Sequence, residues 1–216
     1  MTTERPRARA VGSHRLAHLT ALEARRLLGS NPRLLVPVGT MIARGPHLPL
    51  GCDAEVLTRF ADDLSAELGI AVAPVIPFGV HSRRDPDAPG SASLTRKTLH
   101  RLLNELIAAW ETEAKVRDVF ILTTHAADAH LEALSTIRSA GRVTLIDIYA
   151  AAVPDDLRDL PADTLLLEAV APELIDRSQG PPGGAPEGAA SRLYAAILAS
   201  AAERIRRMID EDRPGG

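Results

Sequence analysis

Charged and imidazole side chains lie in a segment that directly follows a predicted buried strand. The apolar run Leu34–Val38 is typical of such a strand, and Arg44, His47 and Asp53 come after it. A guanidinium can bind a carboxylate through two hydrogen bonds, and an imidazole beside a carboxylate can exchange protons near neutral pH. These residue types predict acid–base chemistry or anion binding. The alternative for Asp53 is the N-cap of the helix that follows it.

A second imidazole follows the next long apolar run of the chain. His125 comes after the predicted strand Val119–Thr123, and Asp128 begins a helical segment three residues later. Because the carboxyl ends of parallel strands meet at one edge of a sheet, we expect His125 to lie close to Asp53. A histidine that is only hydrogen-bonded at a strand end is the alternative.

Three further side chains are weaker candidates for the same site. His81 lies in a charged loop, which is usually solvated, and Asp163 precedes a helical segment, where a carboxylate often only favours the helix start. Cys52, beside Asp53, could be a nucleophile, but a packed small hydrophobe is the alternative. We assign His47, His81, Asp128 and Asp163 to substrate binding.

Strand-like and helix-like segments alternate along the chain. This order predicts an α/β protein, a three-layer α-β-α sandwich with a mostly parallel central sheet. The expected strands are 34–38, 70–76, 119–123 and 143–148, and the expected helices are 20–28, 54–68, 95–114, 128–139, one beginning at 164–170, and 189–209. We expect one domain over residues 16–210, a disordered or loosely docked tail at 1–15, and a polar tail at 211–216.

The segment Gly39–Asp53, GTMIARGPHLPLGCD, resembles the creatininase (creatinine amidohydrolase) family, which reads approximately G-S-x-E-Q-H-G-P-H-L-P-L-x-T-D there. The segment Asp163–Leu174, DTLLLEAVAPEL, resembles that family's E-T-S-L-M-L-x-L-x-P-E-L. With partial matches elsewhere, the resemblance covers about residues 30–205. It implies a creatininase-like fold, a small-molecule substrate with a C–N bond, and a homo-oligomer, with a hexamer as one expected form.

The resemblance also implies a dinuclear metal site, but this chain has replaced several of its ligands. The positions that match the family's ligands are held by Ile42, Arg44, Asp53, His125, and either Ala127 or Asp163. An alkyl side chain cannot ligate a metal, and a guanidinium repels one. A catalytic zinc site normally has at least three protein ligands. We therefore expect no metal cofactor, with Zn or Mn on Asp53, His125 and Asp163 as the fallback.

Three functions remain open from the sequence. The first is a metal-independent enzyme for an amide or cyclic amide, suited to specialised biosynthesis, with Arg44 as anion anchor and His125 and Asp53 as the acid–base pair. The second is a non-catalytic protein that binds a metabolite or supports an assembly. The third is an amidohydrolase with a single metal on Asp53, His125 and Asp163.

Composition excludes several other classes of protein. The net charge of −3 and the 3% aromatic content give no reason to expect a nucleic-acid or membrane partner. The single cysteine excludes an internal disulfide framework. Because no apolar stretch approaches the roughly 20 residues that span a bilayer, and the basic N-terminus lacks an apolar core, we expect a cytoplasmic protein.

Overall fold

A computed structural model describes residues 14–81, 89–124, 127–150, 153–180 and 185–211 of the chain. It is an α/β structure whose central sheet has four parallel strands in the order β2-β1-β3-β4. The strands are β1 (Arg33–Pro37), β2 (Ala71–Val72), β3 (Asp118–Thr123) and β4 (Arg142–Asp147). The α-helices are α1 (Ala21–Ser30), α2 (Cys52–Leu68), α3 (Arg96–Ala114), α4 (Asp128–Ser135), α5 (Ala162–Val170) and α6 (Ala189–Glu211).

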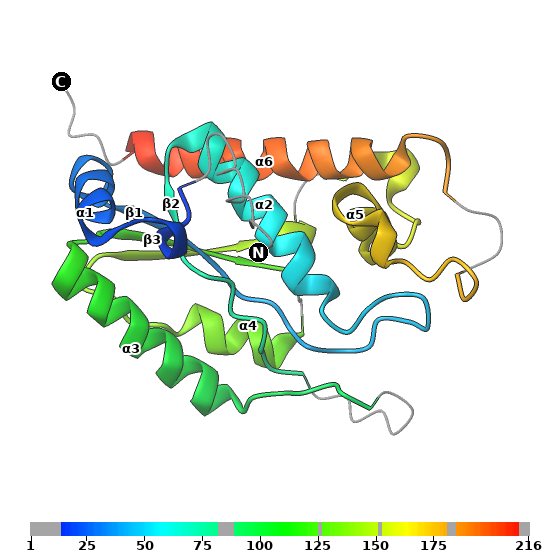
Figure 1. Cartoon of the computed structure of the whole chain (residues 1–216), viewed down its shortest axis with the longest axis horizontal. Coiled ribbons are helices and arrows are strands. Elements are labelled where there is room, and N and C mark those ends of the chain that lie inside the picture. Colours follow the sequence, from blue (N-terminus) through cyan, green and yellow to red (C-terminus); the bar gives the residue numbers. More distant parts are fainter. Residues whose placement is uncertain (1–13, 82–88, 125–126, 151–152, 181–184, 212–216) are drawn as a thin grey trace, which may run out of the picture.

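The helices cover both faces of the sheet, as the prediction of three layers requires. Helices α2, α5 and α6 lie on one face, and α3 and α4 lie on the other (Figure 1). Side chains alternate between the two cores: in β3, Phe120 and Leu122 pack under α2, α5 and α6, whereas Val119 and Ile121 pack toward α1, α3 and α4. Both faces of each strand are therefore buried, which explains its continuous apolar sequence.

Most helix ends follow from local sequence signals. Thr20 caps α1 in a reciprocal capping box with Glu23, and Thr95 caps α3. Gly69 ends α2 in the left-handed conformation (φ 65°) that glycine adopts without strain. Helix α1 extends two residues beyond its predicted end at 28, because Gly29 lies inside the helix and Asn31 is the C-cap.

Two predicted elements are shorter than their sequence patterns suggested. The strand expected over 70–76 is reduced to β2, with one isolated bridge between Val38 and Ile76 further along. Pro74 and Pro77 interrupt this segment, and proline cannot donate the hydrogen bond that a strand ladder needs. Helix α4 ends at Ser135, four residues before the predicted end at 139.

An ion pair holds the start of the described chain against α2, between Arg15 and Asp62 of that helix. Residues 1–13 and 212–216, which include most of the two predicted tails, lie outside the described part.

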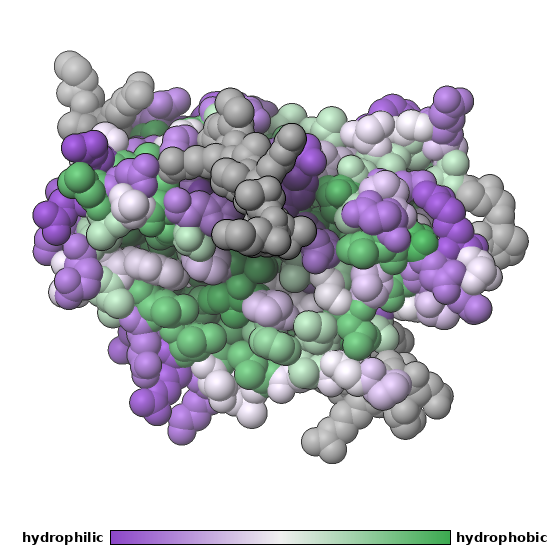
Figure 2. Space-filling model, viewed as in Figure 1, coloured by the Kyte–Doolittle hydropathy of each residue, from purple (hydrophilic) through white to green (hydrophobic). Residues whose placement is uncertain are grey.

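Figure 2 shows apolar side chains gathered along α3 on the viewed face, and Leu102 of that helix is one of the exposed large hydrophobics. Among the described helices, none has the length and apolar character needed to cross a bilayer.

Candidate functional site

Asp53 links the two ends of the segment between β1 and α2. Its Oδ2 accepts hydrogen bonds from the backbone N–H of Thr40 (3.0 Å) and from its hydroxyl (2.5 Å). Gly39 permits this approach, since a Cβ there would lie 2.9 Å from the Cβ of Asp53. The helix is capped at Gly51, so Asp53 lies within its first turn and is not the N-cap. The carboxylate is 2% exposed and joins the end of β1 to the start of α2.

Arg44 lies between Asp53 and a second carboxylate, that of Asp163. Its Nε is 2.8 Å from Asp53 Oδ1, and its Nη2 donates to Asp53 Oδ2 at 3.0 Å. Its Nη1 donates to Asp163 Oδ2 at 3.2 Å, and Nη2 is 3.5 Å from the carbonyl oxygen of Thr124. The guanidinium is 14% exposed and joins three segments that are distant in sequence.

Electrostatics favour the charged form of Arg44 in this position. Burial alone would lower the pKa of its guanidinium, but the charges of Asp53 and Asp163 outweigh burial, so the pKa is raised above its ordinary value. A buried cation is thus compensated by two carboxylates, as buried charges require. The guanidinium donors that we expected to bind a substrate anion are used by the protein itself.

Two further groups surround Asp163. The Tyr149 hydroxyl donates a hydrogen bond to Asp163 Oδ1, and the Cys52 thiol lies 4.0 Å from the Asp163 carbonyl oxygen. Burial and the nearby carboxylates raise the pKa of the Tyr149 hydroxyl, and for the same reasons they raise the pKa of the Cys52 thiol to about 12. Both groups are therefore protonated at neutral pH. Sequence reasoning missed Tyr149, although it follows β4 at the same edge of the sheet.

The remaining predicted site residues are spread around this cluster. His47 Nε2 is 2.8 Å from the hydroxyl of Thr164, which is the neighbour of Asp163 in α5. Asp128 is the first residue of α4, and His81 is half-buried with its backbone N–H bonded to the Ser93 hydroxyl. His125, the predicted acid–base group, lies outside the described residues.

A fully buried histidine that sequence reasoning missed supports two of the loops. His130 Nδ1 accepts the backbone N–H of Val80 (3.1 Å), so its proton is on Nε2, which is 3.0 Å from the Thr123 hydroxyl. It thereby ties the loop after β2 to the end of β3. Its only sequence signal is a position on the buried face of α4, with Ala133 and Leu134.

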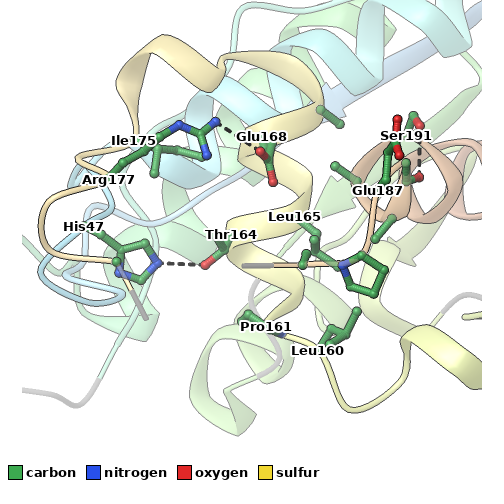
Figure 3. Close-up of a pocket in the computed structure, with 17 residues that line it drawn as sticks. His47, Leu160, Pro161, Thr164, Leu165, Glu168, Ile175, Arg177, Glu187 and Ser191 are labelled. Carbon is green, nitrogen blue, oxygen red and sulfur yellow. Dashed lines mark hydrogen bonds and ion pairs between the residues drawn. The ribbon is translucent and has the colours of Figure 1, made fainter. Parts of the chain in front are cut away.

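A cavity of about 850 Å³ is lined by Pro161 and Thr164, which flank Asp163 in the sequence, although no residue of the carboxylate cluster itself is among its lining residues. Its walls are one face of α5, the turn before α6, and the chain after Leu174, with His47 at one side (Figure 3). Apolar side chains such as Leu165 and Ile175 share the lining with an ion pair between Arg177 and Glu168. The volume is within the range of small-molecule sites. His47 and Thr164 connect this cavity to the segments that carry Arg44 and Asp163.

The comparison with protein families identifies the family of the chain. The sequence model described as creatinine amidohydrolase matches residues 17–208. The chain belongs to the creatininase family. The predicted family and the predicted α/β sandwich are both confirmed, and the chain is a member of a family of amidohydrolases.

Curated relatives of the creatininase-family chain include two hydrolases. It is 28% identical over 95 residues to a 3-dehydro-scyllo-inosose hydrolase of Thermotoga maritima, covering 44% of this chain and 30% of that protein. It is 32% identical over 88 residues to a mycofactocin precursor peptide peptidase of Mycolicibacterium smegmatis, covering 38% and 35%. The matches thus span about a third of the length of each curated relative.

Solved creatininase structures share the fold over almost the whole chain. One crystal structure of creatinine amidohydrolase has a TM-score of 0.74 at 18% identity, covering 94% of this chain and 99% of the other. A mutant creatininase described as Zn-Zn type and a creatininase described as Mn both have a TM-score of 0.73, at 16% and 18% identity, covering 94% of this chain and 99% and 100% of theirs. At this identity the likeness shows the fold alone.

The expectation of no metal cofactor for this chain is contradicted, because solved creatininases that share its fold include zinc and manganese forms. The residues of this chain nevertheless fit a metal poorly in the arrangement described. Asp53 and Asp163, two of the three fallback ligands, do converge, but the Arg44 guanidinium lies between them. In the described part of the chain, no group of three or more His, Cys, Asp or Glu side chains is placed to hold a metal ion. With Arg44 in this position, both carboxylates already form ion pairs with its guanidinium.

Proposed function

We propose that this creatininase-family protein hydrolyses a C–N bond in a small amide or cyclic amide that binds in the cavity beside α5. The observation that carries this proposal is that the segments bearing the cluster residues also line the cavity. The segment that carries Arg44 and Asp53 also places His47 at the cavity, and Thr164, the neighbour of Asp163, lines it. A substrate there would lie next to the carboxylate cluster. The mixed apolar and polar lining suits a small organic molecule that carries an amide.

In this proposal His125 is the acid–base group. It is the next residue in the sequence after Thr124, whose carbonyl oxygen is 3.5 Å from Arg44 Nη2. Arg44 fixes the two carboxylates, because its donors are directed at Asp53 and Asp163 and not at the cavity. Asp53, which accepts from Thr40 and Arg44, is a positioning residue for the loop and not a proton acceptor for substrate.

A turnover assay on small amides, cyclic amides and short peptides tests this function. Release of free amine would be measured for the protein purified without chelator, with and without added Zn²⁺ or Mn²⁺. We expect turnover by the wild type, and a loss of about 100-fold or more in His125→Ala, the usual contribution of a general acid–base group. Asp155→Asn is the matched control, since that carboxylate is 94% exposed and pairs only with Arg158 in the structure described. Equal rates for the wild type and His125→Ala would refute the assignment.

The closed arrangement of Arg44 with its two carboxylates favours one second candidate, a non-catalytic member of the family that binds a metabolite. A guanidinium that is paired with two carboxylates does not need a substrate anion to compensate its own charge. Binding of an amide in the cavity without turnover, weakened by Thr164→Val but not by His125→Ala, would favour this candidate over the hydrolase.

A further inference from the structure

The guanidinium of Arg44 holds the two carboxylates that a cation at this site would need. Asp53 and Asp163 are 110 positions apart in the sequence, and Arg44 reaches both within 3.2 Å. Carboxylate oxygens are among the ligands of zinc and manganese in proteins. A divalent ion and a guanidinium cannot both occupy the space between the same oxygens, because like charges at this separation repel strongly.

The surroundings of the cluster make this competition strong. Asp53 is 2% exposed and Arg44 is 14% exposed, so little water is available to screen this pair, whereas Asp163 is 29% exposed. Tyr149 keeps its proton and donates a hydrogen bond to Asp163, and Cys52 is a neutral thiol, so neither adds a negative charge. Within the described residues of the cluster, Arg44 is the cation that pairs with both carboxylates, and its single charge offsets one of their two negative charges.

We propose that Arg44 is an internal competitor of a divalent cation: Asp53 and Asp163 become available to the ion only when the guanidinium leaves them. The solved zinc and manganese creatininases show that this fold accommodates such ions. In this chain, the side chain at position 44 sets how tightly the ion binds. The inference concerns ion affinity alone, so it stands or falls independently of the proposed hydrolysis.

Calorimetric titration of the full chain with Zn²⁺, and separately with Mn²⁺, tests this inference after chelator treatment and dialysis. We expect Arg44→Met to bind Zn²⁺ at least about ten-fold more tightly than the wild type, since it keeps side-chain length and removes the competing charge. Arg44→Lys, which keeps the charge, is the matched control and should remain close to the wild type. The gain should disappear in Arg44→Met/Asp53→Asn, which lacks one of the two carboxylates.

Thermal denaturation with and without Zn²⁺ checks that the variants fold. Arg44→Gln, which keeps an amide donor toward the carboxylates, is titrated in parallel, so that a folding defect in Arg44→Met leaves the comparison intact. Affinities of the wild type, Arg44→Met and Arg44→Gln within about two-fold of one another would overturn the proposal. A gain that survives loss of the Asp53 carboxylate would also overturn it, because the ion would then bind elsewhere.

Discussion

At the scale of single residues, the site is a set of mutually satisfied charges. Asp53 accepts from Thr40 and Arg44, and Arg44 also donates to Asp163. Such a set is stable only if complete, since removing one partner leaves a buried charge uncompensated, typically at about 3–5 kcal/mol. Arg44 and Asp53 are therefore expected to depend on each other for stability.

Cys52 gives a prediction about alkaline stability. Burial, with the charges of Asp53 and Asp163, raises the pKa of its thiol to about 12 from 9.0. The unfolded chain therefore releases this proton at lower pH than the folded chain, so stability is intact below pH 9 and falls between pH 9 and 12. We expect the free energy of unfolding to fall in this window by up to about 1.4 kcal/mol per pH unit more than in Cys52→Ala. Urea denaturation from pH 8 to 10.5 measures both, and parallel curves would contradict the prediction.

At the scale of elements, the site depends on how closely the strand ends approach one another. Gly79, in the loop after β2, lies against the segment after β1 and against His130 of α4. A Cβ at this position would be 2.5 Å from the Gly39 carbonyl oxygen and 2.5 Å from His130 Cε1. The loop therefore has no room for a side chain, and His130 fixes it through the Val80 N–H.

A pair of glycine substitutions tests this packing. We expect Gly79→Ala to lower the free energy of unfolding by at least about 2 kcal/mol, because the backbone oxygen of Gly39 cannot move away cheaply. Gly29→Ala is the control: its added Cβ meets nothing within 4 Å inside α1, and it should stabilise the helix by about 0.5–1 kcal/mol. Urea denaturation of both variants gives the comparison. If Gly79→Ala proved as well tolerated as Gly29→Ala, the described packing would be incorrect.

The sequence was sufficient for the elements because local signals agree with tertiary packing. The strands β1 and β3 contain continuous apolar runs, and α2 and α3 have clear apolar faces, so both patterns could be read directly. The side-chain pairings could not be read. The contact of Arg44 with Asp163 joins residues that are 119 positions apart, and no local pattern indicates that Tyr149 contacts Asp163 or that His130 contacts Thr123. Resemblance predicted which positions meet, but not that Arg44 would turn inward.

At the scale of the whole molecule, three strand ends and one helix start converge at the carboxyl edge of the sheet. The segments after β1, β3 and β4 contribute Arg44, Thr124 and Tyr149, and α5 contributes Asp163. This is the edge where parallel sheets commonly bind ligands, and the 850 Å³ cavity lies beside it. The homo-oligomer that the family resemblance implies stays a prediction, which light scattering of the purified chain would test.

The pairing of Arg44 with Asp53 is the central structural claim, and a double-mutant cycle measures it directly. Free energies of unfolding would be determined by urea denaturation, in buffer with chelator, for the wild type, Arg44→Met, Asp53→Asn and the double variant. We predict that each single variant loses about 3 kcal/mol, and that the double variant loses less than the sum by about 2 kcal/mol or more. Losses that add within about 0.5 kcal/mol would show that the two side chains do not interact, and would contradict the account.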